Sequence, residues 1–473
     1  MATDKTQTES QIRLGSDDEL NLYLNPAIAR FLKNVSNAIL RDPGLPRPDP
    51  TVSAWQVPPH PSLASIQSRD LPEFTDFAVI GSGITGCSVT KTLLEHPSTT
   101  NSRVTVLEAR TLVSGATGRN GGHLVTASGH TFGPLAEQHG IEAAREITRF
   151  SIMNIDHLMR LAREFDPALQ EECQIRVVLK VMAVGDDETW ASAKSSVLGF
   201  QDKVPEYSAY HSIIERDQVP ERWNIKNASG AVEHEAGAIW PYRLLTGIYQ
   251  RLLDKYSDRL SIETNTPVTR VEFSEGLYPY AITTPRGSIR AKKVIHYAET
   301  GFFDTGLYYL QQNALTGSIW IGNETAYMKD VLTADDTYVP EEARQALSTV
   351  LPKLFLNGWG SETVSEIESI WSGIQGHTAD GLPIVGKIPE SLTGATGDDG
   401  QWIAAGFNGY GMDKCWLTGE ALVKMMLGDD VSGWFPRAFL VTEERLQTKL
   451  TADQTLLKFA KIALPGGARD GKL

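Results

Sequence analysis

Short apolar runs alternate with helically spaced hydrophobic residues from about residue 77 onward. The runs at 77–80 and 104–107 are β-rich, which predicts two buried strands, and residues 84–95 between them have the spacing of a helix. Strand and helix patterns that alternate in this way predict a parallel, doubly wound α/β sheet.

The rest of the chain mixes longer helical patterns with short strands. We expect helices at 137–165, 187–201 and 414–426, and strands at 175–185, 270–273, 281–283, 293–297 and 314–321. The fold class is therefore α/β (α+β overall), with a second, mostly antiparallel β domain beside the doubly wound one.

The first 75 residues have a different character. A helical pattern around 25–40 is followed by seven prolines between Pro43 and Pro61, a density that forbids helix and favours an extended path. Such a strip is either disordered or docked on the body of the protein. The apolar residues Trp55, Leu63, Ile66 and Leu71 favour docking.

Length and charge exclude several function classes. At 473 residues, the chain is about three times the typical ~150-residue domain, so we expect two or three modules. Its 44 basic and 58 acidic residues give a net charge of −14, which argues against a nucleic-acid partner. Cys87, Cys173 and Cys415 form no CxxC pair, so neither a metal site nor a disulfide framework is expected.

The termini and the hydropathy suggest a location. No run of 18 apolar residues occurs and residues 1–16 do not resemble a secretion signal, so we expect a soluble intracellular protein without a membrane partner. The ending 471–473 approximates the peroxisomal S-K-L signal with Gly in place of Ser. A cytoplasmic location is favoured, and a peroxisomal one stays weakly supported.

A glycine-rich turn joins the first predicted strand to the first predicted helix. It has the form G-x-G-x-x-G, in which the glycines allow a tight turn, close approach of backbone N–H groups to a pyrophosphate, and close packing of helix on strand. The second strand ends in Glu108, whose carboxylate can accept hydrogen bonds from ribose hydroxyls and would repel a 2′-phosphate. The turn consists of Gly81, Ser82, Gly83, Ile84, Thr85 and Gly86. The alternative is an ordinary glycine-rich turn followed by an unrelated glutamate.

The spacing of the glycines does not distinguish an FAD site from an NAD site, and the next glycine-rich segment helps to do so. Residues 114–123 read SGATGRNGGH and can bring several backbone amides against a flat polar ring system. Here the chain resembles the D-amino-acid oxidase, glycine oxidase and sarcosine oxidase superfamily of FAD-dependent oxidoreductases, and most closely its γ-glutamylputrescine oxidase-like, fungal-type branch. The resemblance implies cofactor contacts at Ala109, Arg110, Ser114, Gly115, Ala116, Thr117, Arg119, Asn120, Gly121, Gly122 and His123.

Two C-terminal segments extend the resemblance. Residues 371–386 resemble the family's T-x-D-x-x-P-x-x-G signature, and residues 404–412 resemble its closing strand-to-helix turn, which lies near the pyrimidine end of the flavin. The implied contacts are Val268, Ala298, Asp380, Gly406, Asn408, Gly409, Tyr410, Gly411 and Met412. Glu299 departs from the pattern, because relatives usually have a smaller, uncharged residue there.

The resemblance also implies a domain plan. It assigns residues 76–136, 231–301 and 366–435 to a discontinuous, Rossmann-like FAD-binding domain. Residues 137–230 and 302–365 form the substrate domain. Residues 1–75 are then an extension packed on the body, and residues 436–473 a helical tail.

The chemistry implied is oxidation of a C–N bond in a small amine or amino acid. A hydride passes to flavin N5, an imine forms, and O2 is the simplest acceptor, giving H2O2. Candidate catalytic residues are Tyr410, His123, Gln375 and Trp371. Segment 371–378 contains no cysteine, so a non-covalent FAD is expected, with His123 as the remaining possible tether. Oxidation of a C–O or C–C bond, or flavin binding without turnover, are the alternatives.

Overall fold

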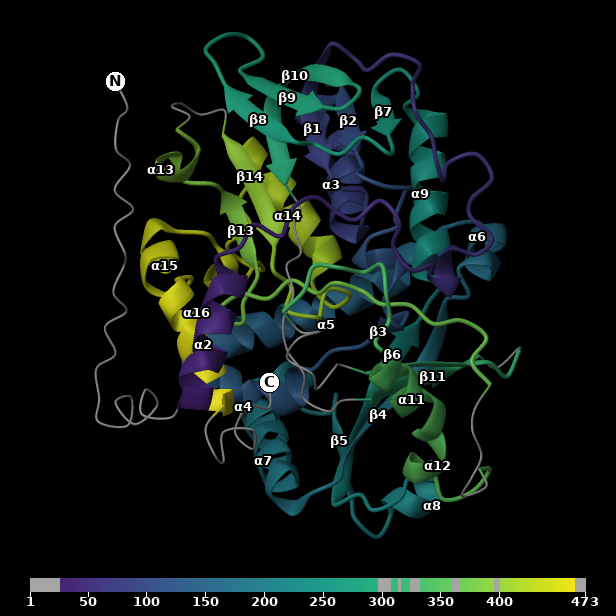
Figure 1. The fold of residues 1–473 in the computed structure, drawn as a ribbon. Helices are drawn as coiled ribbons and strands as arrows, with labels where there is room; N and C mark the ends of the chain where they lie inside the picture. Colours follow the sequence, from purple (N-terminus) through teal and green to yellow (C-terminus); the bar gives the residue numbers. More distant parts are fainter. Residues whose placement is uncertain are drawn as a thin grey trace.

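The fold is taken from a computed structural model, which describes residues 26–296, 308–313, 316–323, 332–359, 366–394 and 400–463. An eight-stranded sheet fills the upper half of the molecule in Figure 1. Its strand order is β13 (Ile384–Lys387), β14 (Gln401–Ala405), β10 (Gly287–His296), β1 (Phe74–Ile80), β2 (Val104–Leu107) and β7 (Leu260–Glu263), and β8 (Arg270–Phe273) and β9 (Tyr280–Thr284) extend it through β10. The strands from β14 to β7 are parallel.

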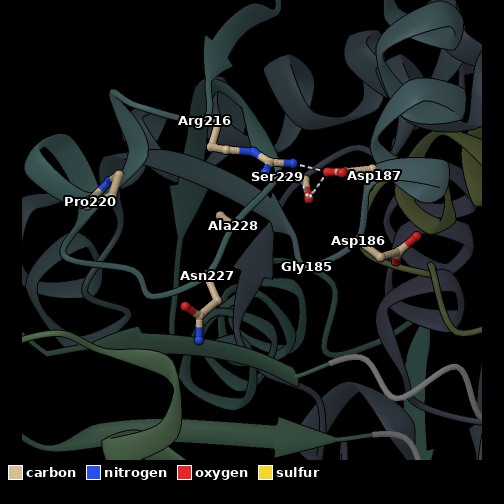
Figure 2. Close-up of a pocket in the computed structure, with 8 residues that line it drawn as sticks. All are labelled: Gly185, Asp186, Asp187, Arg216, Pro220, Asn227, Ala228 and Ser229. Atoms are coloured by element: carbon tan, nitrogen blue, oxygen red, sulfur yellow. Dashed lines mark hydrogen bonds and ion pairs between the residues drawn. The ribbon is translucent and has the colours of Figure 1, made fainter.

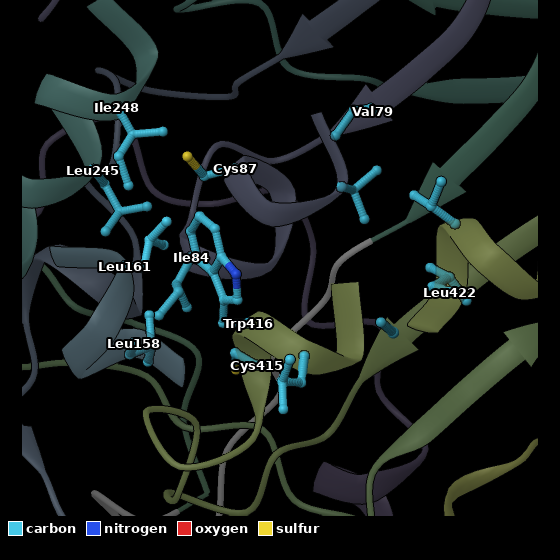
Figure 3. Close-up of a cluster of buried hydrophobic side chains, with 14 of the residues drawn as sticks. Val79, Ile84, Cys87, Leu158, Leu161, Leu245, Ile248, Cys415, Trp416 and Leu422 are labelled. Atoms are coloured by element: carbon cyan, nitrogen blue, oxygen red, sulfur yellow. The ribbon is translucent and has the colours of Figure 1, made fainter. Parts of the chain in front are cut away.

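Helices α3 (Ile84–Glu95), α14 (Cys415–Leu427), α9 (Pro241–Lys255) and α5 (Ile141–Glu164) enclose the main hydrophobic core beside this sheet. Trp416 lies among Ile84, Leu161 and Leu245, side chains from three different helices (Figure 3). This packing holds the glycine-rich start of α3 against the start of α14.

The second sheet lies in the lower half of Figure 1 and is antiparallel throughout. β6 (Gly230–Ala238) pairs with β4 (Arg176–Val184), and also with β3 (His123–Leu124) and β5 (Ser212–Glu215). Helices α4 (Ser128–His139) and α7 (Asp187–Lys203) pack beside it, and β11 (Tyr308–Gln312) pairs with β12 (Ile319–Asn323) as a separate hairpin. The predicted α/β fold class with a second antiparallel sheet is confirmed.

Other elements are short. The remaining α-helices are α6 (Pro167–Glu172), α8 (Val219–Trp223), α11 (Glu341–Thr349), α12 (Leu351–Leu354), α13 (Glu390–Thr393) and α15 (Glu443–Thr448), together with the terminal pair described below. The 3-10 helices are η1 (Ala54–Gln56), η2 (Pro97–Thr99), η3 (Ala116–Gly118), η4 (Pro205–Tyr207) and η5 (Arg437–Phe439). Within the described ranges, no helix has the length and apolar character needed to span a bilayer.

Three sequence-based expectations are wrong. The single helix at 137–165 is interrupted at Gly140, whose φ of 88° ends α4 and precedes α5. The strand at 314–321 is misplaced, because residues 316–318 connect the two strands of the β11–β12 hairpin. The domain boundary at 230/231 cuts into β6, which belongs to the second sheet through Ala238.

The proline-rich strip lies on the body of the protein. Trp55 and Leu63 are buried in the main core. Before the strip, α2 (Pro26–Ile39) packs against α16 (Ala452–Ala463) through Val35 and Leu456, so the two ends of the described chain lie side by side (Figure 1).

Candidate active site

The G-x-G-x-x-G turn and the second glycine-rich segment meet at the start of α3. Gly81 has a φ of 104°, which favours glycine, and its N–H donates to the Leu107 carbonyl at 2.8 Å. The Ile84 N–H, in the first turn of α3, donates to Thr117 Oγ1 at 2.9 Å, and a Cβ on Gly83 would lie 3.1 Å from the same oxygen. Thr85 and Gly86 are buried in α3. The first turn of a helix has amides without intrahelical partners, and those other than the Ile84 N–H are the donors that a phosphate needs.

Glu108 lies beside this turn at the carboxyl end of β2. Its Oε2 accepts hydrogen bonds from the Ser82 N–H at 2.9 Å and the Ser82 hydroxyl at 2.6 Å, and its Oε1 accepts one from the Arg110 N–H at 3.0 Å. Oε2 thus uses both of its acceptor sites, whereas Oε1 keeps a further one for a ribose hydroxyl. The Thr266 N–H donates to the Glu108 carbonyl at 2.8 Å, which brings the segment leading to Val268 alongside.

The loop from Ser114 to Gly122 is shaped by glycines and leaves one polar atom without a partner. A Cβ on Gly122, which has a φ of 69°, would lie 2.5 Å from the Ile239 carbonyl oxygen, and a Cβ on Gly121 would lie 2.5 Å from His123 Nδ1. The buried Ser114 hydroxyl has no hydrogen-bond partner among the described residues. Gly115 has open space at its Cβ position, and Ala116 begins the 3-10 helix η3.

The Arg119 side chain is bound by protein groups on several segments. Its guanidinium donates to the carbonyls of Ser114, Ser372 and Thr51 and to the Thr51 hydroxyl. Burial lowers its pKa to about 10, so it stays a cation at neutral pH. The buried carboxylate of Asp336 lies 3.8 Å from Arg119 and 2.8 Å from Arg110. Both arginines therefore bind protein groups that join the loop to distant segments.

The closing turn and the T-x-D signature form one unit. Gly406, Asn408 and Gly409 have φ values of 70°, 55° and 76°. The Asn408 N–H donates to the Gly376 carbonyl at 2.7 Å, and its side-chain oxygen accepts from the Thr378 N–H at 2.9 Å. The Asn408 side chain therefore helps to hold this turn. The carbonyl of Met412 accepts from Asn154 on α5 at 3.0 Å.

Asp380 is committed to another partner. Arg445 of α15 binds both of its carboxylate oxygens, at 2.8 and 3.1 Å, and both side chains are buried. The carboxylate therefore has a protein partner, and the predicted cofactor contact at Asp380 stays a prediction. A buried carboxylate needs a paired cation, which Arg445 provides. This ion pair joins the T-x-D segment to α15 in the C-terminal tail.

The starts of α3 and α14 are in direct contact. A Cβ on Gly419 would lie 2.8 Å from the Thr85 carbonyl oxygen, and the Ser88 hydroxyl donates to the Trp416 carbonyl at 2.5 Å. The Gly411 carbonyl accepts the Cys415 N–H at 2.8 Å where α14 begins. Two helix N-termini, each with a positive partial charge, thus lie beside the glycine turns.

Three of the four catalytic candidates belong to these joined segments. Trp371 donates its indole N–H to the Arg119 carbonyl at 2.9 Å. The Gln375 side chain occupies the space beside Gly409, where a Cβ would lie 2.8 Å from its Oε1, and that oxygen lies 3.1 Å from His377 Nε2. Tyr410 lies beneath the Lys414 ammonium, 5.6 Å from its ring centroid.

The fourth candidate, His123, lies on the second sheet. Its Nε2 is 3.3 Å from the Leu310 carbonyl, and its ring meets Tyr309 edge to face. Burial lowers the pKa of His123, so the imidazole is neutral at pH 7. It is a hydrogen-bonding group here and not a cation.

Sequence reasoning missed that the N-terminal strip covers the second glycine loop. The Trp55 indole donates to the Asn120 carbonyl, and Gln56 donates to the Gly118 carbonyl at 3.1 Å. Trp55 stacks on Trp320 with a centroid distance of 3.8 Å and meets Trp240 edge to face at 5.2 Å. Burial of one tryptophan could be expected from the sequence, but no pattern identifies the loop on which it packs.

Two open cavities lie elsewhere. One of about 490 Å³ is bordered by Asp187, Arg216 and Ser229 at the far end of the second sheet (Figure 2). Another of about 700 Å³ lies around the end of α14, near Met425 and Phe435. Neither is lined by a residue predicted to contact the cofactor.

The donor set fits FAD. A glycine turn at a helix start, a buried carboxylate at the end of β2 and an unpartnered Ser114 hydroxyl provide groups for phosphate and ribose. The start of α14 provides partial positive charge for the flavin ring. Ala298 and Glu299 lie outside the described residues, as does the C-terminal triplet 471–473. In the described part of the chain, no cluster of three metal-ligating side chains occurs.

Comparison with known proteins agrees with this geometry. No curated protein matches the chain. Structures of similar fold include L-proline dehydrogenase from P. horikoshii (19% identity, TM-score 0.55, covering 78% of this chain and 98% of that one). Glycine oxidase from Geobacillus kaustophilus has 17% identity and a TM-score of 0.56, covering 78% and 99%. L-amino acid deaminase from Proteus myxofaciens, solved with anthranilate, has 14% identity and a TM-score of 0.55, covering 84% and 99%.

At these identities the likeness concerns the fold. The family defined as "DAO: FAD dependent oxidoreductase" matches residues 76–298 and 275–425, which together span more than half of the chain. The chain therefore belongs to the DAO family of FAD-dependent oxidoreductases.

Proposed function

We propose that this protein oxidises a C–N bond of a small amine or amino acid. The observation that carries the proposal is that the glycine-rich segments meet at the starts of α3 and α14. The Ile84 N–H donates to Thr117 and so joins the first segment to the second. The Trp371 indole donates to the Arg119 carbonyl and so joins the second segment to the T-x-D segment. Structures of similar fold are named for enzymes of glycine, L-proline and L-amino acids, and this supports an amino-group substrate. The SGATGRNGGH segment supports the γ-glutamylputrescine oxidase-like, fungal-type branch.

Bound FAD would accept the hydride from the carbon that carries nitrogen, leaving an imine for hydrolysis, and O2 is the proposed acceptor that then yields H2O2. The chain's own residues prepare this site by position and charge. Backbone N–H groups of the 406–412 turn and the start of α14 favour negative charge next to them. We expect the stacked Trp55 and Trp320, which pack on the second glycine loop, to limit the access of water there.

A hydride transfer of this kind requires the neutral amine and needs no dedicated acid. His123 is neutral at pH 7 because burial lowers its pKa, so it can orient a substrate amine without repelling it. Gln375 and Tyr410 are the proposed polar contacts on the opposite segment, and Trp371 is a proposed wall of the pocket.

We propose that FAD is held without a covalent bond. Segment 371–378 has no cysteine, and Cys87, Cys173 and Cys415 are all buried. Burial raises the pKa of Cys173 to about 11, which keeps that thiol protonated and unreactive. Acid precipitation should therefore release all of the yellow colour into the supernatant.

Anaerobic bleaching of the purified yellow protein tests the function. A panel of amines and amino acids should reduce the flavin, whereas the matching alcohols and hydroxy acids should not. Bleaching only by alcohols or acids would move the activity to C–O or C–C oxidation. A flavin that no substrate bleaches, but that dithionite reduces, would indicate binding without turnover.

A further inference from the structure

One face of the second sheet carries charged and imidazole side chains toward the candidate active site. In the antiparallel register Lys180 is paired with His234, and Arg176 and His123 are both paired with Ala238. Cross-strand partners share a face, and residues two apart on a strand do so as well. Lys180, Arg176, His234 and His123 therefore lie on the same face of the sheet.

The charge of Lys180 is poorly compensated. Its Nζ donates to the Thr126 carbonyl at 3.5 Å, and Asp413 is the carboxylate among the described residues whose charge acts on it. Asp413 is itself bound by Lys414, at 2.7 and 2.9 Å. The carboxylate whose charge acts on Lys180 is thus already paired with another ammonium. Burial lowers the pKa of Lys180 to about 8, although the residue as a whole is of intermediate exposure.

Histidines surround this ammonium. His211 Nε2 is 3.0 Å from the Ser128 hydroxyl. Its Nδ1 has no hydrogen-bond partner among the residues that the structure describes, although the residue is only 4% exposed. The His234 ring lies 4.9 Å from that of His211 and stacks on Tyr210 at 5.1 Å. Burial lowers the pKa values of His130, His211 and His234 to about 3, 2 and 4, so all three are neutral at pH 7. These rings offer hydrogen-bonding atoms and leave the positive charge of Lys180 unopposed.

This lysine–histidine cluster (Lys180, His130, His211 and His234) is connected to the closing turn of the candidate site. Asp413 directly follows Met412, and its Oδ2 accepts from the Ser151 hydroxyl at 2.6 Å. The Ser151 hydroxyl is 2.6 Å from that of Thr126, the residue whose carbonyl Lys180 binds. The charge of Lys180 also contributes to the lowered pKa of His123. The cluster therefore borders the region where the substrate of the proposed reaction must lie.

We propose that Lys180, with the surrounding histidines, binds a carboxylate of the substrate. An ammonium that is out of bulk water and lacks a full counter-charge is stabilised when an anion binds. The inference rests on the proposed function and narrows it: the substrate is an amine that also carries a carboxylate, and not a simple monoamine or diamine. Nothing in the sequence motifs pointed to Lys180.

The site should respond to pH through Lys180. The charged and titratable groups near it are Asp413, Arg176 on the same face of the sheet, the neutral His123 and the three histidines of the cluster. Lys414 binds Asp413, and Tyr210 stacks on His234. Raising the pH above about 8 removes the proton from the Lys180 ammonium, so carboxylate affinity should fall there. The histidines do not contribute in this range, because they titrate well below neutrality.

The test uses purified FAD-loaded protein and unreactive ligands. Acetate, butyrate, hexanoate and benzoate are titrated against the matching neutral amides, and binding is followed by flavin absorbance and by calorimetry. Wild-type protein should bind at least one carboxylate more tightly than its amide. Lys180→Met should weaken that carboxylate by about tenfold or more, whereas Lys180→Arg should stay within about threefold. The exposed Lys203 at the end of α7 provides a matched control, Lys203→Met, which should change nothing.

Two results would overturn the inference. One is carboxylate binding by Lys180→Met, with full flavin content, that equals the wild type. The other is a wild-type holoprotein that binds none of the four carboxylates in preference to its amide. Failure of the proposed function gives a different result. In that case no amine or amino acid bleaches the flavin, even though carboxylates bind through Lys180.

Discussion

The two sheets of this protein differ in the polarity of the side chains that they carry. In the large sheet, β2 is buried along its whole length, and Val79, Val106 and Ile295 have no exposed surface. The second sheet has a charged lysine, an arginine and two histidines on one face, among residues of mostly intermediate exposure on β4. A parallel sheet covered on both faces must be apolar, whereas an antiparallel sheet can turn one face toward polar groups.

The difference assigns separate tasks to the two halves. The apolar sheet and its helices position backbone turns, which bind a nucleotide through N–H groups and tolerate little change. The polar face presents side chains, and we propose that these recognise a substrate by charge. We therefore expect substitutions in the first half to alter folding or cofactor binding, and substitutions in the second to alter ligand choice.

The largest effect is expected in the core beneath the first sheet. Trp416→Ala removes a buried indole between α3, α5 and α9 and should lower the free energy of unfolding by about 3–5 kcal/mol. Chemical denaturation followed by far-UV circular dichroism measures this. Leu392→Ala, at a residue that is 66% exposed, is the control and should stay near the wild type. Equal losses in both variants would contradict the packing.

At Lys180 in the second sheet, the stability of the protein should depend on pH. Its folded pKa lies below that of a free lysine, so the ligand-free protein gains stability as the pH rises from about 8 to 10.5. The gain is on the order of 2–3 kcal/mol and should be absent from Lys180→Met. The difference between the two proteins in urea unfolding at pH 7 and pH 10 measures it. The same pH dependence in both proteins would mean that the Lys180 ammonium is solvated in the folded state.

A smaller effect is expected for the ribose site. Glu108→Gln keeps the size of the side chain but removes the charge that Ser82 and Arg110 contact, and FAD affinity should fall about tenfold, or 1.4 kcal/mol. Flavin content after dialysis, and fluorescence titration with FAD, measure the change. The surface variant Glu95→Gln should keep its flavin. Undiminished FAD affinity in Glu108→Gln would remove this residue from the cofactor site.

The smallest effect concerns the N-terminal strip. Trp55→Phe preserves an aromatic ring over Trp320 but loses the hydrogen bond to the Asn120 carbonyl. We expect a loss of about 1 kcal/mol in stability and a modestly faster release of flavin in stopped-flow dilution. Trp359→Phe is the matched control. Release that is unchanged in Trp55→Phe would mean that the strip covers the loop without holding it.

The local pattern around the first glycine turn could be read from the sequence to the residue. The helix expected at 84–95 and the strand at 104–107 have the bounds of α3 and β2, because both depend on runs of neighbours. Partners distant in the chain were beyond reach. The sequence predicted FAD contacts at Arg119 and Asp380, but not that Thr51, Ser372 and Arg445 bind their side chains across the fold.

Residue order alone determined the glycine turns, the acidic end of β2 and the family, since backbone conformation and short motifs depend on adjacent residues. Only tertiary structure decided which side chains remain available for a ligand. The availability of a side chain depends on partners that the fold brings from distant segments. Such partners bind the guanidinium of Arg119, whereas the Lys180 ammonium is left incompletely paired.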